Sequence, residues 1–364
     1  MKLKEIISVF EEAAPFSLQE SYDNSGIQFG NPEDEVSKGL ICLDITEKVV
    51  DEAIENRCDL IISHHPLLFK GIKQLTGQHY TQKALIKAIK HDICLLSVHT
   101  NLDSVMHGVN HKLAQKMGLN NIRVLQPRKG LLKKLVVFCP VVHAEKVRNA
   151  LFKAGAGVIG DYDCCSYNLD GQGTFRAGDN TQPFVGEKGQ VHFEEEFRIE
   201  TILPSYLEKN VIKAMIEAHP YEEVAYDLYP LDNAFEKTGM GMVGDLPEPE
   251  NENFFLQKLK TALKAHGIRH SPLTGNQVKK VALCGGSGSF LRDSAMAAGA
   301  DIFVTADLKY HDFFDATDRM LLADVGHYES EQFTSEILYE IVSKKITTFA
   351  LQISGINTNP VRYF

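Results

Sequence analysis

Two adjacent histidines at the end of a predicted strand are the residues of this chain best suited to chemistry. Residues 59–66 read DLIISHHP. A branched apolar run that ends at a proline predicts a short buried strand over 59–63. Because adjacent strand side chains point to opposite faces, His64 and His65 serve one cavity only where the backbone bends, or they serve two ions. The alternative is one buried, hydrogen-bonded histidine and one exposed histidine.

Further metal-type ligands follow two other predicted strands. His99 and Asp103 lie at the end of the strand predicted over 93–100. His327 and Glu331 follow a short strand that breaks at a glycine, and their spacing of four residues puts them on one helix face. Each of these residues also has an ordinary structural explanation. Asp103 can be a helix N-cap or form an Asx turn, and His327 can be a residue of the cap region. Glu331 can interact favourably with the helix macrodipole.

Together these residues predict a pair of divalent metal ions. They are His64, His65, Asp103, His327 and Glu331. We expect them on one rim of an α/β sheet, at the strand ends where open sheets place ligands. Five N and O ligands are too many for one catalytic zinc with an open position. They suit two ions about 3.5–4 Å apart, as in two-metal hydrolases. The ligand types favour Zn, Mn or Fe and do not choose among them.

Three nearby polar residues are candidates for catalysis. We predict that His99, Asp307 and His311 transfer protons or contact the substrate, and the alternative for each is to orient a ligand histidine. A metal-dependent hydrolase acting on a phosphoester or nucleotide-like substrate is the favoured function, since two-metal sites stabilise spread negative charge. The competing hypothesis is a metal-dependent regulatory or scaffold protein without turnover.

The elements that must position these residues alternate between helix and strand. Strands are predicted over 39–43, 59–63 and 93–100, and helices over 3–13, 46–55, 81–90, 109–117 and 330–343. This alternation predicts a parallel or mixed sheet covered on both faces. Residues 39–69 also align without gaps to residues 281–311, and His65 then falls on Asp307. We therefore expect two βαβ-type halves that form one sheet-based α/β domain.

A different pattern occupies the middle of the chain. Its predicted strands cover 132–139, 161–168, 194–203 and 224–229, and its helices cover 144–154 and 205–218. The order βαββαβ is that of the ferredoxin-like unit. We expect an α+β domain over 131–231, inserted into a discontinuous di-metal domain of residues 1–130 and 232–364. The Gly-rich segment 171–189 is read as a lid or a surface loop. His219 either binds metal or meets a helix dipole.

Length and composition limit the classes of protein. The 364 residues are too many for one ordinary core, and 44% hydrophobic and 24% charged residues are typical of a soluble globular protein. A net charge of −10 argues against general affinity for nucleic acid or anionic membrane and leaves a local basic patch open. No apolar run approaches the roughly 18 residues of a membrane span. Seven cysteines without C-x-x-C, and no signal-peptide pattern, favour the cytoplasm.

The chain resembles a known family in four separated blocks. These are HHP at 64–66, HTNLD at 99–103, TADLKYH at 305–311 and GHYESE at 326–331. They are similar, in the same order, to the signature blocks of the Ngg-interacting-factor-like proteins, whose members carry the name GTP cyclohydrolase 1 type 2 homologue. The block AHPYEE at 218–223 resembles that of the CutA/PII-like domain inserted in longer members. The resemblance spans the whole chain.

The resemblance implies a di-metal site at the five predicted ligands and a CutA/PII-like insert. It also implies a ring-shaped homohexamer whose sites face an inner cavity. The resemblance does not identify the reaction. The sequence has no phosphate-cradling P-loop pattern and no cysteine-containing zinc site. Cyclohydrolysis of GTP is therefore not the expected reaction, and the expected substrate is an unidentified small molecule.

Overall fold

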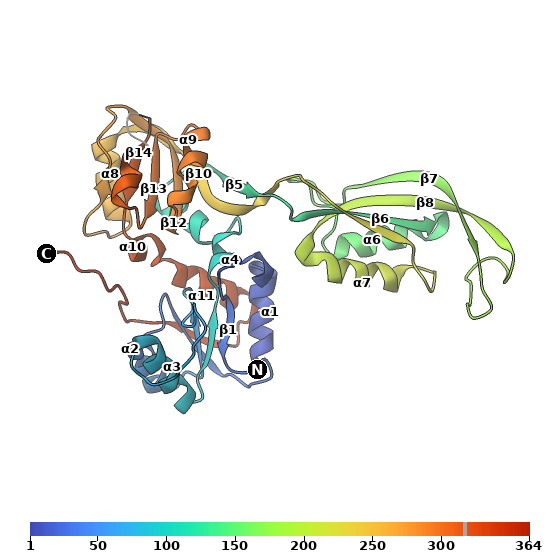
Figure 1. The fold of residues 1–364 in the computed structure, drawn as a ribbon, viewed down its shortest axis with the longest axis horizontal. Helices are drawn as coiled ribbons and strands as arrows, with labels where there is room; N and C mark the ends of the chain where they lie inside the picture. The colour runs from blue at the N-terminus through green and yellow to red at the C-terminus, as the bar shows by residue number, and fades with distance from the viewer. Residues whose placement is uncertain (316–318) are drawn as a thin grey trace. The chain divides into compact units, whose positions relative to one another are not determined.

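The computed structural model describes residues 1–315 and 319–364, which form two compact units. Unit 1 combines residues 1–127 with residues 237–364, and unit 2 is residues 128–236. The insert limits expected from the sequence, 131 and 231, lie a few residues inside those of unit 2. None of the described helices is long and apolar enough to cross a membrane. The chain is a mixed α/β protein with three sheets (Figure 1).

The first sheet of unit 1 has the strand order β1-β4-β3-β2-β15. Strands β2, β3 and β4 are parallel, β15 extends them in parallel, and β1 closes the other edge in the antiparallel sense. Cys42, Ser63 and Ser97 lie opposite one another, so the segments after them leave at the same edge. The strands are β1 Gly26–Phe29, β2 Lys38–Cys42, β3 Leu60–Ser63, β4 Cys94–Ser97 and β15 Ala350–Ile353.

Helices cover both faces of this sheet because its strands alternate two sets of apolar side chains. On one face, α1 (Leu3–Ala13) and α11 (Thr334–Lys345) share a core with Ile41, Ile62 and Leu96. On the other face, α2 (Glu47–Glu55) and α3 (Tyr80–Lys90) pack with the alternate strand residues. Thr46 caps α2, since its side chain accepts a hydrogen bond from the backbone N–H of Val49.

The second sheet of unit 1 has the order β11-β14-β13-β12-β10-β5. Its central strands β12, β13 and β14 are parallel, and β10 and β11 run antiparallel to their neighbours. Helices α5 and α8 pack with one face, and α9 packs with the other. The elements are α5 Val109–Lys116, β5 Asn120–Arg128, β10 Phe235–Asn251, α8 Glu252–Ala262, β11 Arg269–His270, β12 Gln277–Ser287, α9 Arg292–Ala297, β13 Ile302–Ala306 and β14 Leu321–Asp324.

The two βαβ halves belong to one unit, and each lies in a sheet of its own. The copy β2-α2-β3 lies in the first sheet, and the copy β12-α9-β13 lies in the second. Strands β1 and β15 pair with β4 and β2, so these two strands of the first half need no partner strand from the second half. The helix expected over 330–343 is also divided into α10 (His327–Glu331) and α11.

Unit 2 is a four-stranded antiparallel sheet of order β7-β8-β6-β9 with two helices, in the chain order βαββαβ. Its core joins Leu135, Val137 and Ile199 to Val147 and Met215. The elements are β6 Leu132–Pro140, α6 Ala144–Lys153, β7 Ser166–Arg176, β8 Val191–Pro204, α7 Glu208–Ala218 and β9 Tyr226–Pro230.

Two local predictions for unit 2 are wrong. The strand expected over 161–168 is β7, which runs to Arg176, so the first part of the expected Gly-rich loop is strand. It is strand because β7 pairs with β8 in continuous register from Ser166 to Arg176. The helix expected from residue 205 begins at Glu208, after a short 3-10 turn over Ser205–Leu207, and it has no side-chain cap.

Candidate metal centre

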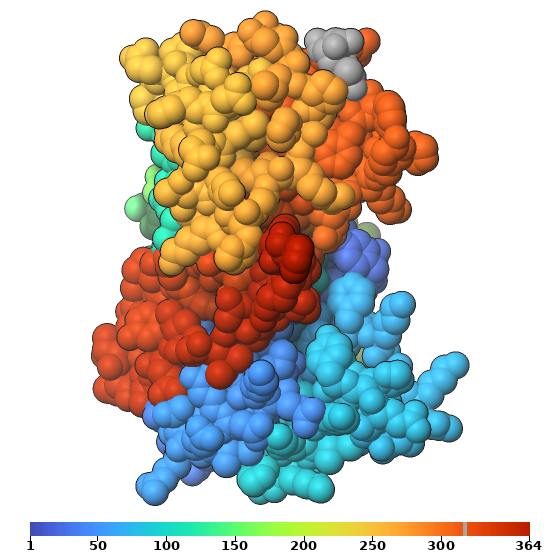
Figure 2. All heavy atoms as spheres, turned by 90° about the vertical axis from the view of Figure 1, so that its left-hand side faces the viewer, coloured from blue at the N-terminus to red at the C-terminus, as the bar shows by residue number. Residues whose placement is uncertain are grey.

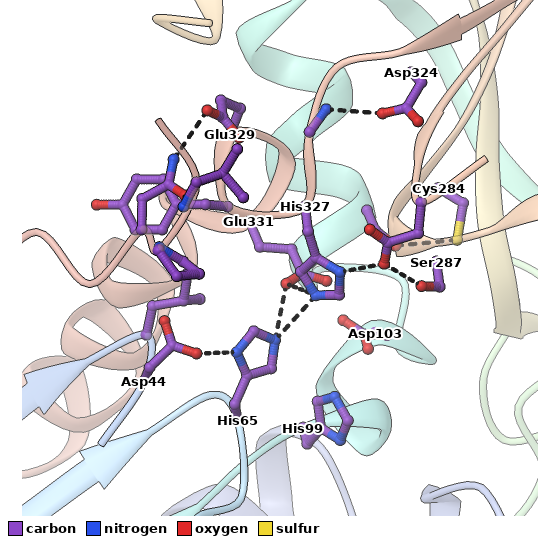
Figure 3. A pocket seen from close by; sticks show the side chains of 18 of the residues that line it. Asp44, His65, His99, Asp103, Cys284, Ser287, Asp324, His327, Glu329 and Glu331 are labelled. Carbon is purple, nitrogen blue, oxygen red and sulfur yellow. Dashed lines mark hydrogen bonds and ion pairs between the residues drawn. The ribbon is translucent and has the colours of Figure 1, made fainter. Parts of the chain in front are cut away.

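Four of the five candidate ligands line a cavity of about 1070 Å³ within unit 1, and the fifth, His64, is buried with its Nε2 3.7 Å from Asp103 Oδ1. Parallel strands of both sheets end at this cavity (Figure 3). The first sheet supplies His65 after β3 and Asp103 at the end of the short helix α4 (Thr100–Asp103), which follows β4. The second sheet supplies Asp307 after β13 and His327 after β14. The rim expected on one sheet is therefore built from two.

His64 has a buried nitrogen without a hydrogen-bond partner. Its side chain is fully buried, and its Nδ1 donates to the carbonyl oxygen of Val98 at 2.9 Å. Within the described parts of the chain its Nε2 finds no hydrogen-bond partner, although Asp103 Oδ1 lies 3.7 Å away and Glu331 Oε1 lies 3.9 Å away. Burial lowers the pKa of His64 to about 3, so the ring is neutral. A neutral buried imidazole with an open lone pair suits a metal ligand.

His65 and His327 converge on the carboxylate of Glu331. The Nε2 atoms of both rings lie 3.0 Å from Glu331 Oε2 and 3.3 Å from each other (Figure 3). His327 and Glu331 belong to α10, where the spacing of four residues brings them together as expected. Glu331 is 4% exposed, so its charge is held in a site with little water.

Three of the histidines have their other ring nitrogen fixed by a carboxylate. The Nδ1 of His65 donates to Asp44 Oδ1 at 2.7 Å, and the Nδ1 of His327 donates to Asp307 Oδ2 at 2.6 Å. The Nδ1 of His99 lies 2.7 Å from Asp23 Oδ1 in the same way. Such a bond fixes the tautomer and ring orientation that a metal-binding histidine needs.

Two overlapping sets of ligand atoms result. His64, His65 and His99 form one set, and His65, His327 and Glu331 form the other. Within each set the ligand atoms lie within 4.8 Å of one another. Because His65 belongs to both sets, the groups are adjacent parts of one candidate centre. His99, predicted as a catalytic residue, thus lies among the candidate ligands.

The carboxylates of the cluster raise the pKa values of two of its histidines. Although burial opposes their charge, contacts with Asp44 and Glu331 raise the pKa of His65 to about 10, and Glu331 with Asp307 raise that of His327 to about 11. Burial and the charge of Glu331 raise the pKa of Asp103 well above its usual range. The two cationic rings lower the pKa of Glu331 despite its burial. The site therefore stabilises cationic partners at its centre.

The cavity wall carries a surplus of negative charge. Of the described residues that line it, six are Asp or Glu and one, Arg269, is Lys or Arg. Arg269 is already paired with Asp324 and also donates to the carbonyl oxygen of Leu308 at 2.9 Å. Buried or half-buried carboxylates need a compensating cation, and divalent ions would provide it.

Two glycines make room for carboxylates beside the candidate ligands. Gly286 has φ +60°, and a Cβ there would lie 2.3 Å from Glu331 Oε1. Gly326 has φ +91°, and a Cβ there would lie 2.3 Å from Glu329 Oε2. Both positions favour glycine through backbone conformation and through space.

The third residue predicted as catalytic lies elsewhere. His311 is in a 3-10 turn (Tyr310–Phe313), where its ring packs against the rings of Tyr310 and Phe314. It is not among the residues described as lining the cavity. Asp307 lies in the wall with φ +56°, a strained backbone for an aspartate, and it orients His327.

Sequence reasoning missed Asp44 and undervalued Asp23. Asp44 follows β2 directly, which is the same strand-end signal that identifies the other candidates, and it holds His65. The pair Asp23-Asn24 is typical of a turn, yet the side chain of Asp23 is fully buried and binds both His99 and the backbone N–H of Thr100, the latter at 3.1 Å. Neither residue lies in a ligand-type motif.

His219 of unit 2 takes neither of its predicted roles. Its Nε2 donates to the carbonyl oxygen of Phe138 at 2.9 Å, and its Nδ1 accepts from the backbone N–H of Tyr221 at 3.1 Å. With both nitrogens engaged it has no free lone pair for a metal. Burial, together with the charge of His143, lowers its pKa, so it is not the cation that a helix dipole would favour.

Residues 1–360 match the family Duf34/NIF3 (NGG1p interacting factor 3). A protein of Halalkalibacterium halodurans named GTP cyclohydrolase 1 type 2 homolog is 39% identical over 98% of each chain. A Bacillus subtilis protein of the same name is 38% identical over 99% of this chain and 98% of its own.

Solved structures agree over the whole chain. A Bacillus cereus protein related to NIF3 is 41% identical, with a TM-score of 0.88, over 100% of this chain and 99% of its own. A Staphylococcus aureus protein is 30% identical, with a TM-score of 0.79, over the same shares. The resemblance predicted from the four sequence blocks is confirmed: the chain belongs to the Duf34/NIF3 family.

Proposed function

We propose that this chain is a divalent-metal-dependent hydrolase with a two-metal centre that acts on a phosphoester or nucleotide-like substrate. One observation carries the proposal. Four histidines each have Nδ1 bound to an oxygen, and this leaves Nε2 as the nitrogen available to an ion. Two carboxylates, Asp103 and Glu331, reach the same place. This donor set fits Zn, Mn or Fe.

We assign the metal ligands by the direction in which their free atoms converge. They are His64, His65, Asp103, His327 and Glu331. The orphaned Nε2 of His64 supports the assignment most strongly, since a buried imidazole nitrogen otherwise finds a donor. When bound, two ions supply Lewis acidity and an activated water. The carboxylates that raise the histidine pKa values would then balance metal charge.

The surrounding residues divide into positioning groups and one candidate for proton transfer. Asp44 and Asp307 hold His65 and His327 in a fixed orientation. His99 is the candidate for proton transfer, because it lines the cavity beside the ligand cluster and Asp23 fixes its Nδ1. If it ligates instead, its replacement will lower metal content and turnover together.

The cavity suits an anionic substrate only when ions are present. Six carboxylates in its wall repel a phosphoester, and Arg269 is occupied by Asp324. Two divalent ions would offset four of those negative charges at the ligand cluster and would hold the phosphoryl oxygens. The volume of about 1070 Å³ accommodates a nucleotide-sized molecule. GTP cyclohydrolysis stays outside the proposal, since the name of the relatives is the sole support for it.

Two further expectations from the family resemblance enter here as proposals. We propose that unit 2 is a CutA/PII-like domain, and the βαββαβ order of its elements supports this. We also propose that the chain assembles into a homohexameric ring. Light scattering coupled to size exclusion tests the ring: a mass of about six chains supports it, and a monomer contradicts it.

The test of function combines metal content with turnover. Elemental analysis of the purified protein should give about two transition-metal ions per chain, as two-metal sites require. His65→Ala and Glu331→Ala should lose that metal while circular dichroism shows the fold retained. A panel of phosphomonoesters, phosphodiesters and nucleotides should reveal turnover that disappears on chelation and returns with added metal.

Three results separate the competing functions. Metal with turnover supports the hydrolase. Metal without turnover on any substrate of the panel contradicts the hydrolase and favours the regulatory or scaffold protein. A wild-type protein that holds no metal and takes none up contradicts both functions.

A further inference from the structure

The last residues of the chain form one wall of the metal cavity. After β15 in the first sheet, the segment 356–364 continues to the cavity, and Asn359, Pro360, Val361 and Tyr363 line it. Figure 2 shows these C-terminal residues in dark red, lying where the region of the first sheet meets that of the second. We name residues 356–364 the C-terminal strap. It shows no catalytic motif in the sequence.

Through Thr358, the strap contacts the part of the candidate centre that the first sheet supplies, which we call its first half. The hydroxyl of Thr358 donates to Asp44 Oδ2 at 2.6 Å, and the other oxygen of the same carboxylate accepts from His65 Nδ1 at 2.7 Å. Asp44 is thus held from both sides. A free Asp44 would rotate about its side-chain torsions, and the His65 ring would lose its fixed orientation.

Through Asn359, which is 7% exposed, the strap contacts the second half of the centre, the part that the second sheet supplies. Its Nδ2 donates to Glu329 Oε1 at 3.0 Å, and Glu329 is itself 4% exposed. The other oxygen of Glu329 packs over Gly326, the residue that precedes His327. Asn359 therefore holds the carboxylate that fills the space beside the turn from which His327 projects.

The strap is pre-shaped for these two contacts. Asn357 Oδ1 accepts from the backbone N–H of Asn359 at 2.9 Å, and Asn359 Oδ1 accepts from that of Val361 at 3.0 Å. These Asx-type bonds fix the local backbone. The linker before the strap is anchored away from the centre, because the Ser354 hydroxyl donates to Glu52 of α2.

We propose that the C-terminal strap is a positioning element of the metal centre. Thr358 acts through Asp44 on His65, and Asn359 acts through Glu329 on the turn that presents His327. Asp44 follows a strand of the first sheet and Glu329 lies on a helix that follows a strand of the second, so the strap fixes the two halves of the centre against each other. The inference rests on the proposed function, because it assumes that His65 and His327 bind metal.

The experiment measures Zn²⁺ affinity by competition with a chromophoric chelator, on full-length protein that has been stripped of metal. Thr358→Ala should weaken binding about fivefold, the equivalent of one hydrogen bond, and Thr358→Ser should restore it. Asn359→Ala should have a similar effect, and the double variant should lose about 25-fold because the two contacts act on separate ligands. Ser354→Ala removes the bond to Glu52 and the bond from the backbone N–H of Ile356. Neither bond involves Asp44 or Glu329, so this variant should match the wild type.

A second measurement separates positioning from mere folding. In the metal-free protein, the Nδ1–H proton of His65 should give a hydrogen-bonded NMR signal that broadens in Thr358→Ala and persists in Asn359→Ala. Unchanged Zn²⁺ affinity in the double variant overturns the inference and leaves the proposed function standing. An equal loss of affinity in Ser354→Ala also overturns it, since the strap would then act through general stability. A wild-type protein that binds no Zn²⁺ contradicts the proposed function first.

Discussion

The buried histidines of the two units differ in how their ring nitrogens are hydrogen-bonded. In unit 2, both ring nitrogens of His219 are bonded to backbone groups. In unit 1, the Nε2 of His64 has no hydrogen-bond partner within the described residues, and those of His65 and His327 crowd one carboxylate. Burial alone therefore does not mark a ligand. The mark is an anchored ring whose second nitrogen points at other ligand atoms.

The carboxylates in the cavities of the two units also differ in whether groups of the chain satisfy them. Unit 2 also has a cavity, of about 720 Å³, with Glu196 in its wall. Glu196 is a single buried carboxylate there, and the hydroxyl of Tyr221 donates to it at 2.9 Å. In unit 1, the buried Glu331 and the half-buried Asp103 line one cavity, and the pKa of Asp103 is raised well above its usual range. In unit 2, a hydrogen bond within the unit satisfies Glu196. In unit 1, the two carboxylates require positive charge from outside the chain.

The largest effect expected is the loss of metal on Glu331→Gln. This change keeps the shape of the side chain and removes the charge that both histidines face. We expect metal affinity to fall at least 100-fold, measured by elemental analysis after dialysis against a weak chelator. The matched control is His219→Gln in unit 2, which should keep the wild-type metal content. Equal loss in both variants would contradict the contrast between the units.

Metal should stabilise unit 1 selectively. At free metal 100 times the dissociation constant, binding adds about 2.7 kcal/mol to the free energy of unfolding. Hydrogen exchange with mass spectrometry should show slower exchange in β3, β4 and α10, and unchanged exchange in β6 and α7. Protection spread evenly over both units would show that the ions act elsewhere.

Asp44→Asn should have an intermediate effect. The amide cannot balance the charge on His65, and partners that orient a ligand histidine are typically worth about 10–100-fold in metal affinity. Tyr221→Phe removes a comparable bond to the carboxylate of Glu196 in unit 2 and should leave metal affinity unchanged. Isothermal titration of metal-free protein with Zn²⁺ compares the two, and equal affinities would contradict the role given to Asp44.

The smallest effect expected is the response of unit 2 to acid. The folded state lowers the pKa of His219 below the ordinary value of 6.5, so the unfolded chain binds the proton more tightly. The contribution of His219 to stability is therefore complete above pH 6.5 and declines as the pH falls below it. The protection factors of α7, which are corrected for the intrinsic pH dependence of amide exchange, should fall between pH 7.5 and 5.5, and His219→Gln should reduce this fall. A fall that is the same in His219→Gln would contradict the assignment to His219.

The sequence predicted those features that depend on local pattern. The apolar spacing of Leu3, Ile6 and Phe10 predicts α1, and the capping residue Thr46 predicts the start of α2. The strand-end positions of His65 and Asp103 place them together, because parallel strands end at one edge. The candidate ligands therefore follow from strand ends and from the spacing of four residues within α10.

The remaining features depend on contacts that no local pattern encodes. Whether two βαβ halves share one sheet is decided by which strands fill the edges, and β15 comes from the far end of the chain. The partners of Asp23 and Thr358 lie 76 and 314 residues away in sequence. His311 shares a sequence block with Asp307, yet the turn between them directs its ring to Tyr310 and Phe314.

The proposed function depends on two ions that bind at the Nε2 atoms of the candidate ligand histidines beside the cavity of unit 1. The most direct test is an anomalous difference map from crystals of the protein loaded with Zn²⁺. We predict two peaks about 3.5–4 Å apart, each in contact with Nε2 of at least one of His64, His65 and His327. A map without peaks there, or with Zn²⁺ only at surface carboxylates or at His219, would contradict the account.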